Sequence, residues 1–168
     1  MVDSLTRKND DSLRGKAEIY RNRSIEHRRT MKLRDNELAL LKIIRSLDAK
    51  YENLVVVVEG NRDVTVLRDL GLKAPIIKTQ TKLPRYKTIE QIVEKAGGKG
   101  KVLILTDYDQ EGEEICSYIE RALEPTGVKT LKGVRIRIRR LMGNWRCIEE
   151  LVALFKRRDS PESESSVI

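Results

Sequence analysis

The sequence predicts an α/β protein with a small, mainly parallel four-stranded sheet flanked by helices. The first observation is the run at residues 54–58, LVVVV, which has no polar alternation and is typical of a strand buried on both faces. The second is that short apolar runs and helix-like patterns alternate from this point onward. Such alternation is typical of strands joined by right-handed helical crossovers. A chain of 168 residues is long enough for one such domain and an extension.

Residues 1–34 are predicted to form a basic N-terminal arm. They show little apolar periodicity, and their second half is dominated by lysine and arginine. The arm could be a helical extension that docks on the domain, a segment that becomes ordered on nucleic acid, or a solvated tail. A packing helix is predicted from Asp35 or Asn36 to about Tyr51. Its apolar residues recur at helical spacing and are Leu40, Leu41, Ile44 and Leu47.

The predicted domain covers residues 35–158, with its core at residues 52–141. Apolar runs predict strands at residues 54–58, 75–78, 102–106 and 133–139. Residues 159–168 are polar and contain a proline, so they are predicted to be a disordered tail.

Helices are predicted between these strands from their start and stop signals. Asn61 should cap the first, Thr88 and Gln91 form a capping-box pattern for the second, and the third should begin near Gln110. Their expected ends are Gly71, Gly97 and Pro125. A last helix is expected from about residue 145.

The stretch at residues 133–139 alternates apolar residues with arginine. This period of two predicts a half-buried strand at the edge of the sheet. Its three arginines would then line one face of the strand and, with the next arginine along the chain, contact a phosphate backbone. They are Arg135, Arg137, Arg139 and Arg140. The alternative is that the charges only protect the sheet edge from aggregation.

The composition favours a polyanionic partner. The net charge is +8, and 36 % of the residues are charged. Nucleic acid is the expected partner, although a charged surface of this kind also suits a heat-adapted protein. Aromatic residues make up only 4 %, which argues against stacking many bases. The sequence has no apolar segment of membrane-spanning length, so we expect a cytoplasmic protein that does not bind membranes.

Acidic residues follow the two most apolar predicted strands. Glu59 comes directly after residues 54–58, and Asp107, Asp109 and Glu111 come after the strand at 102–106. In open parallel sheets, ligands bind beyond the carboxyl ends of the strands, where the strand order switches. If the two strands are neighbours, the four carboxylates share one site. Such a group repels itself unless a cation lies in it, and Mg²⁺, with Mn²⁺ as an alternative, prefers carboxylate oxygens.

Two glycines accompany these acids. Gly60 is expected to let the backbone turn sharply after the first strand, and Gly112 to allow close approach at the start of a helix. Glu111, Glu113 and Glu114 could instead simply complement the positive end of that helix. This alternative does not account for the two aspartates, which precede the helix.

These motifs resemble the Toprim domain shared by type IA topoisomerases, bacterial-type primases and small ribosomal-RNA maturases. The stretch TDYDQEGEEI is similar to the topoisomerase form of the motif. The stretch VVVVEGNRDVTVLRDLG resembles the maturases and small stand-alone archaeal Toprim proteins. Together the resemblance covers residues 52–141.

The resemblance implies roles for individual residues. Glu59 would be the general acid or base in strand breaking and joining. Asp107 and Asp109 would bind Mg²⁺, with Glu111 as a third acid. Some maturase-like relatives carry lysine where this chain has Asn61, so a phosphate contact is expected to pass to Arg62 or Lys78.

The sequence therefore predicts Mg²⁺-dependent cleavage of phosphodiester bonds in structured RNA or DNA. The alternative is a non-catalytic module that binds phosphates through its metal site, within an RNA-processing or replication assembly with protein partners. A third reading takes TDYDQ as the nucleophile loop of a haloacid-dehalogenase-like phosphatase. That loop normally follows the first strand, so this reading ranks last. The chain has no room for the domains of a topoisomerase or primase, and Tyr108 is expected to be a spacer or packing residue.

Overall fold

The computed structural model describes residues 2–151, except the side chains of residues 2–11 and Leu33. Between Leu38 and Ala39 the chain divides into two units. The predicted disordered tail at residues 159–168 lies outside the described residues, as do residues 152–158 of the predicted domain. The domain boundaries drawn from the sequence therefore stay a prediction.

The N-terminal region is helical. Helix α1 (Val2–Lys50) runs without a break through Asp35 and Asn36, so the predicted helix start there is wrong. The reason is that the basic stretch before it contains strong helix formers and no proline. Side chains described between residues 12 and 32 are all exposed. Near the other end of α1, Leu40, Ile44 and Leu47 are almost completely buried in the core, as predicted.

The sheet has four parallel strands in the order β2-β1-β3-β4. The central strands are β1 (Leu54–Val58) and β3 (Lys101–Ile104), with β2 (Ile76–Lys78) beside β1 and β4 (Lys129–Thr130) beside β3. Val57 of β1 pairs with Ile77 on one side and Ile104 on the other. The predicted α/β class and the adjacency of the two most apolar strands are confirmed.

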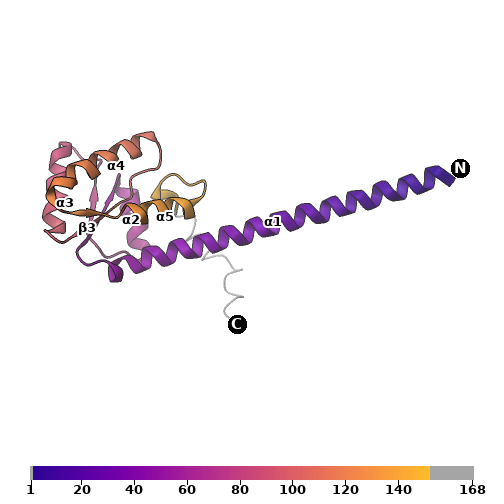
Figure 1. Ribbon diagram of the computed structural model, residues 1–168, viewed down its shortest axis with the longest axis horizontal. Coiled ribbons are helices and arrows are strands. Elements are labelled where there is room, and N and C mark those ends of the chain that lie inside the picture. The colour runs from indigo at the N-terminus through magenta and orange to yellow at the C-terminus, as the bar shows by residue number, and fades with distance from the viewer. Residues whose placement is uncertain (1, 152–168) are drawn as a thin grey trace. The chain divides into compact units, whose positions relative to one another are not determined.

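Helices cover both faces of this sheet. On one face, the end of α1, α2 (Asn61–Asp69) and α5 (Lys132–Met142) pack against Val56 and Val58. On the other, α3 (Arg85–Ala96) and α4 (Gln110–Leu123) pack against Val55 and Val57. Figure 1 shows α3 and α4 together on one side of the sheet. Alternate residues of one buried strand thus serve two apolar cores.

Most helix ends follow the predicted signals. Gly71 and Gly97, with φ of 105° and 65°, lie just beyond α2 and α3. Pro125 lies in a 3₁₀ turn, Glu124–Thr126, that directly follows α4. The capping box at Thr88 is wrong, because α3 already begins after Pro84 and Thr88 is buried inside it.

The predicted edge strand at residues 133–139 is also wrong, because α5 occupies these residues. Ile138 and Met142, four residues apart, are buried, whereas Ile136 is 52 % exposed. The true period is therefore helical, and seven residues were too few to separate the two periods. The sheet edge beside β3 is formed instead by β4, the two residues Lys129–Thr130. In place of the helix expected from Trp145, the described residues show a 3₁₀ turn, Ile148–Leu151.

Candidate metal centre

Three acidic side chains meet at the carboxyl ends of β1 and β3. One carboxylate oxygen from each of Glu59, Asp107 and Asp109 lies within 4.8 Å of the others. The chain passes from β1 to β2 in one direction and later returns to β3 on the opposite side of β1. The acids therefore occupy the position where the strand order switches, which is the usual ligand position in such sheets.

Glu59 is the most enclosed of the three acids. It is only 9 % exposed, and its Oε1 atom is buried with no hydrogen-bond partner among the described residues. A buried acceptor without a partner costs about 1–3 kcal/mol, so the site is incomplete as a purely protein structure. A cation would supply the missing partner. Three carboxylates suit a hard divalent ion that keeps other positions for water or phosphate.

The site favours protonated carboxyl groups when no cation is bound. Burial, reinforced by the negative charge of Asp107, raises the pKa of Glu59 to about 7. Burial also raises the pKa of Asp107, and the nearby charges of Asp63, Asp109 and Glu149 act in the same direction. Near neutral pH, a proton shared between Glu59 and Asp107 thus relieves repulsion that a divalent cation would relieve more fully.

The loop that carries the aspartates is held by the start of α4. Asp109 Oδ1 accepts a hydrogen bond from Gly112 N at 2.7 Å, and Thr106 Oγ1 donates to Gly112 O at 2.8 Å. A Cβ atom at Gly112 would lie 2.0 Å from the backbone oxygen of Asp107. Only glycine fits between the loop and the helix here, so Gly112 sets the position of the two aspartates.

Gly60 is less constrained. Its φ of −137° is open to any residue, and an added Cβ would meet only the flexible end of Gln80, at 3.1 Å. Its amide is nevertheless used, because Gly60 N donates to Asp63 Oδ2 at 3.0 Å. Asp63 Oδ1 also accepts from Glu149 N at 3.0 Å. The buried Asp63, which sequence reasoning missed, thus joins the Glu59 turn to the segment after α5. Its signal was an acid in the first turn after Gly60.

Arg135 lies beneath the aspartate loop. Its guanidinium donates to the carbonyl oxygens of Ile104, Thr106 and Asp107 and to a carboxylate oxygen of Glu113, at 2.9–3.4 Å. Arg135 is 6 % exposed. The expectation that it contacts nucleic-acid phosphate is therefore wrong. The cause is its helical placement, which turns this side chain inward toward the end of β3.

Tyr108 packs in the same region. Arg135 lies over its ring, 4.4 Å from the centroid, and the Tyr108 hydroxyl donates to the backbone oxygen of Arg135 at 3.1 Å. Burial raises the pKa of Tyr108 to about 12. A buried, engaged phenol with so high a pKa is a packing residue and is unsuited to act as a nucleophile.

The sequence pattern that defines the Toprim domain matches residues 54–141. The chain belongs to the Toprim family. A UPF0292 protein of Thermococcus onnurineus is 35 % identical over 60 % of this chain and 72 % of its own length. One from Thermococcus kodakarensis is 31 % identical over 73 % and 88 %. A solved structure of a protein from Aquifex aeolicus is similar in fold, with a TM-score of 0.53, 25 % identity and coverage of 65 % and 94 %.

The other cationic residues predicted to bind nucleic acid in this Toprim domain differ in exposure and in the groups that they contact. Arg62 is exposed and forms an ion pair with Glu149 at 2.9 Å. Lys78 Nζ donates to Asn61 Oδ1 at 2.6 Å, so an ammonium group lies beside Asn61. Arg139 is half-buried and donates to the backbone oxygen of Trp145. Arg137 and Arg140 are exposed on α5.

Glu111 is not among the three acids brought together in the described structure. It is exposed and lines a cavity between α3 and α4 that also includes Tyr118. Its predicted part in binding the cation stays a prediction.

Toprim membership and the acidic cluster together indicate a metal-binding protein with a role in nucleic-acid processing. Among residues 2–151, no helix combines the length and apolar character needed to cross a membrane.

Proposed function

We propose that this Toprim protein cleaves phosphodiester bonds in structured RNA or DNA and requires Mg²⁺, which Mn²⁺ can replace. The observation that carries the proposal is the buried, unpartnered Glu59 oxygen beside Asp107 and Asp109. When bound, the cation stabilises the negative charge that develops on phosphate oxygens during cleavage. We place the protein in the cytoplasm, with nucleic acid as its partner.

Each acid has a part in the proposal. Asp107 and Asp109 would hold the cation, with Glu59 completing the group. Glu59 also suits proton transfer, because burial raises its pKa to about 7, close to a neutral working pH. Gly112 and Arg135 do not touch the substrate in this scheme. They fix the loop that carries both aspartates.

Cationic side chains near the acids would bind the phosphate backbone. Lys78 is the first of these, because its ammonium group lies beside Asn61, two residues from Glu59. Arg62 is the second, and it would bind phosphate in place of its present ion-pair partner, Glu149. Arg137 and Arg140 would extend the contact along α5. Contacts of this kind read charge and not base sequence.

A second candidate is a module that binds phosphates through the metal centre without cleaving them, inside an RNA-processing or replication assembly. The engagement of two arginines favours it. Arg135 is committed to carbonyl groups and Arg62 to Glu149, which leaves fewer cations beside the acids to stabilise a transition state.

One experiment separates the two candidates. Labelled structured RNA and duplex DNA are incubated with the full chain in Mg²⁺, Mn²⁺ or EDTA. The nuclease proposal expects products with either cation, and their loss in Asp107→Asn and Glu59→Gln while binding persists. Glu94→Gln, an exposed acid of α3, is the matched control and should cleave normally. Binding without products under every condition overturns the nuclease proposal and supports the module.

A further inference from the structure

A cavity of about 180 Å³ lies between α3 and α4 at the end of β2. It is smaller than the sites that hold drug-sized ligands, which are at least about 300 Å³. Its volume suits one planar ring system. Its lining residues include Thr79, Gln80, Arg85, Glu111, Ile115 and Tyr118.

The cavity adjoins the candidate metal centre through the backbone. Thr79 N donates to Val58 O at 2.8 Å, and Gln80 N donates to Glu59 O at 2.9 Å. The side chain of Gln80 also approaches Gly60. The segment that lines the cavity is therefore bonded to the residue that carries the buried carboxyl group. A molecule in the cavity would lie next to anything bound at the acids.

The lining combines stacking groups with unused polar atoms. Arg85 lies over the ring of Tyr118, 5.5 Å from its centroid, so a planar cation and an aromatic ring both face the cavity region. Thr79 Oγ1 is buried and has no hydrogen-bond partner among the described residues. Ile115 and Ile119 add an apolar surface. Aromatic rings and guanidinium planes are the groups on which proteins stack unpaired bases.

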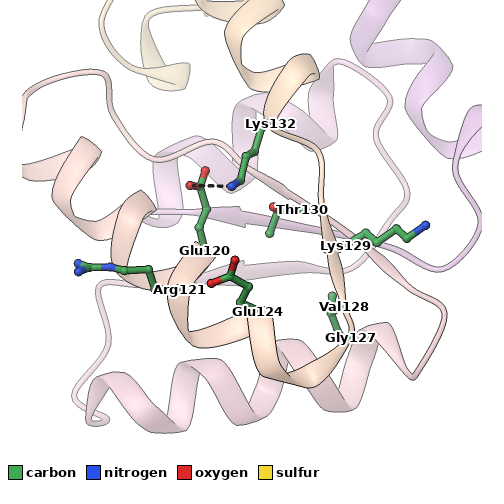
Figure 2. A pocket seen from close by; sticks show the side chains of 8 residues that line it. All are labelled: Glu120, Arg121, Glu124, Gly127, Val128, Lys129, Thr130 and Lys132. Atoms are coloured by element: carbon green, nitrogen blue, oxygen red, sulfur yellow. Dashed lines mark ion pairs between the residues drawn. The ribbon is translucent and has the colours of Figure 1, made fainter.

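A second cavity, with a different lining, serves as a comparison. The cavity in Figure 2 is larger, about 500 Å³, and lies at β4. It is lined by charged residues of both signs, among them the ion pair of Glu120 and Lys132 at 3.8 Å, and it has no aromatic residue. No buried polar atom among its described residues lacks a partner. It gives no indication of a ligand.

We propose that the cavity between α3 and α4 binds a single unpaired nucleobase of the nucleic acid whose phosphate lies at Glu59, Asp107 and Asp109. The inference rests on the proposed function and deepens it. The base would stack on the Tyr118 and Arg85 groups and hydrogen-bond to the Thr79 hydroxyl. The Glu111 carboxylate accepts hydrogen bonds, so it would favour bases that carry an amino group, cytosine, adenine and guanine, over uracil and thymine.

The test uses the full chain with Mg²⁺ and nucleoside 5′-monophosphates, which have no phosphodiester bond to cleave. The methyl NMR signals of Ile89, Ile115 and Ile119 report on the cavity. We expect AMP, CMP and GMP to shift them more strongly than UMP does, and ribose 5-phosphate, which lacks a base, to leave them unchanged. Equal shifts with ribose 5-phosphate, or none with any nucleotide at ~10 mM, overturn the inference, because a site that fails there is weaker than about 3 kcal/mol.

Variants separate stacking from a structural role. Tyr118→Ala should weaken nucleotide binding about tenfold, as expected for loss of one stacked base, whereas Tyr118→Phe should retain it. The matched control is Tyr86→Ala, an exposed tyrosine of α3 that does not line the cavity. Glu111→Gln should remove the preference against UMP. Unchanged binding in Tyr118→Ala, with its NMR spectrum otherwise native, overturns the stacking assignment.

The two proposals fail in different ways. Methyl shifts without cleavage of any nucleic acid leave the base site intact and overturn only the nuclease. Metal-dependent cleavage without methyl shifts overturns only the base site and supports the nuclease.

Discussion

Acidic residues cluster beside two parts of the sheet, the β4 edge and the ends of β1 and β3. The two clusters differ in burial and in whether cationic side chains pair with them. At the β4 edge, Glu120 and Glu124 lie among Arg121, Lys129 and Lys132, as Figure 2 shows, and a partly exposed ion pair joins Glu120 to Lys132. At the ends of β1 and β3, Glu59 is buried, Asp107 is half-buried and Asp109 is exposed. These acids have no ion pair in the described structure, and one buried Glu59 oxygen has no partner. The residue type is the same. The burial of Glu59 beside two further acids, without a counter-charge, is what marks the second group as a binding site.

The largest difference in stability should come from alanine substitutions at two glycines. Gly112→Ala should lower the free energy of unfolding by about 4 kcal/mol, because its Cβ would collide with the Asp107 backbone. Gly127→Ala at the β4 edge meets no atom within 4 Å and should cost only the strain of its φ of 79°, about 1 kcal/mol. Chemical denaturation of both variants measures the difference. Equal losses would mean that the loop yields to the methyl group.

The stability of the metal-free protein should fall as pH rises between about 4.5 and 7. Glu59 has a pKa of about 7 when folded and 4.5 as its ordinary value, so the folded state holds a proton that the unfolded state releases. The decline is on the order of 3 kcal/mol and levels off above pH 7. Denaturation across this range in EDTA tests it. Glu59→Gln should flatten the slope and Glu120→Gln should not. A rise with pH that Glu59→Gln leaves unchanged contradicts the assignment.

Divalent cations should stabilise the protein by binding at Glu59, Asp107 and Asp109 and not at the acids of the β4 edge. At a cation concentration 100 times Kd, Mn²⁺ should add about 2.7 kcal/mol to the free energy of unfolding. The gain should grow with pH, because the cation displaces a proton from Glu59. It should be lost in Asp107→Asn and kept in Glu120→Gln. Thermal unfolding with and without Mn²⁺ measures this, and an equal gain in both variants would place the cation elsewhere.

Replacing two cationic residues of α5 should give a smaller difference in the free energy of unfolding. Arg135→Met should cost about 2 kcal/mol, since it leaves buried carbonyl oxygens of the aspartate loop without a donor. Lys132→Met breaks an exposed ion pair at 3.8 Å and should change stability by less than about 0.5 kcal/mol. Comparable effects in chemical denaturation would show that Arg135 is not essential to the loop.

The meeting of Glu59 with Asp107 and Asp109 could be predicted from the sequence. Each acid follows a strongly apolar run, and parallel strands bring their carboxyl ends to one edge. The adjacency of β1 and β3 needed no long-range information beyond these two rules. Gly112 was also visible, because it opens a helix directly after the acids.

The placement of the arginines could not be predicted in this way. Residues 133–139 fit a period of two as well as the helical period, and the choice depends on which face meets the core. The carbonyl groups that hold Arg135 belong to the end of β3, far along the chain. Asp63 and Glu149 were missed for the same reason, since their hydrogen bond spans 86 positions.

The hydrogen bond between Glu149 and Asp63 has a consequence for how this protein should be divided. The family match ends at residue 141, yet Ile148 and Leu151 are fully buried against the same apolar face as Leu40 and Ile44. Those flanking residues seal the layer on which the Glu59 turn rests. A fragment cut to residues 54–141 alone would expose that layer to water, so the independently folding part is wider than the segment that matches the Toprim pattern.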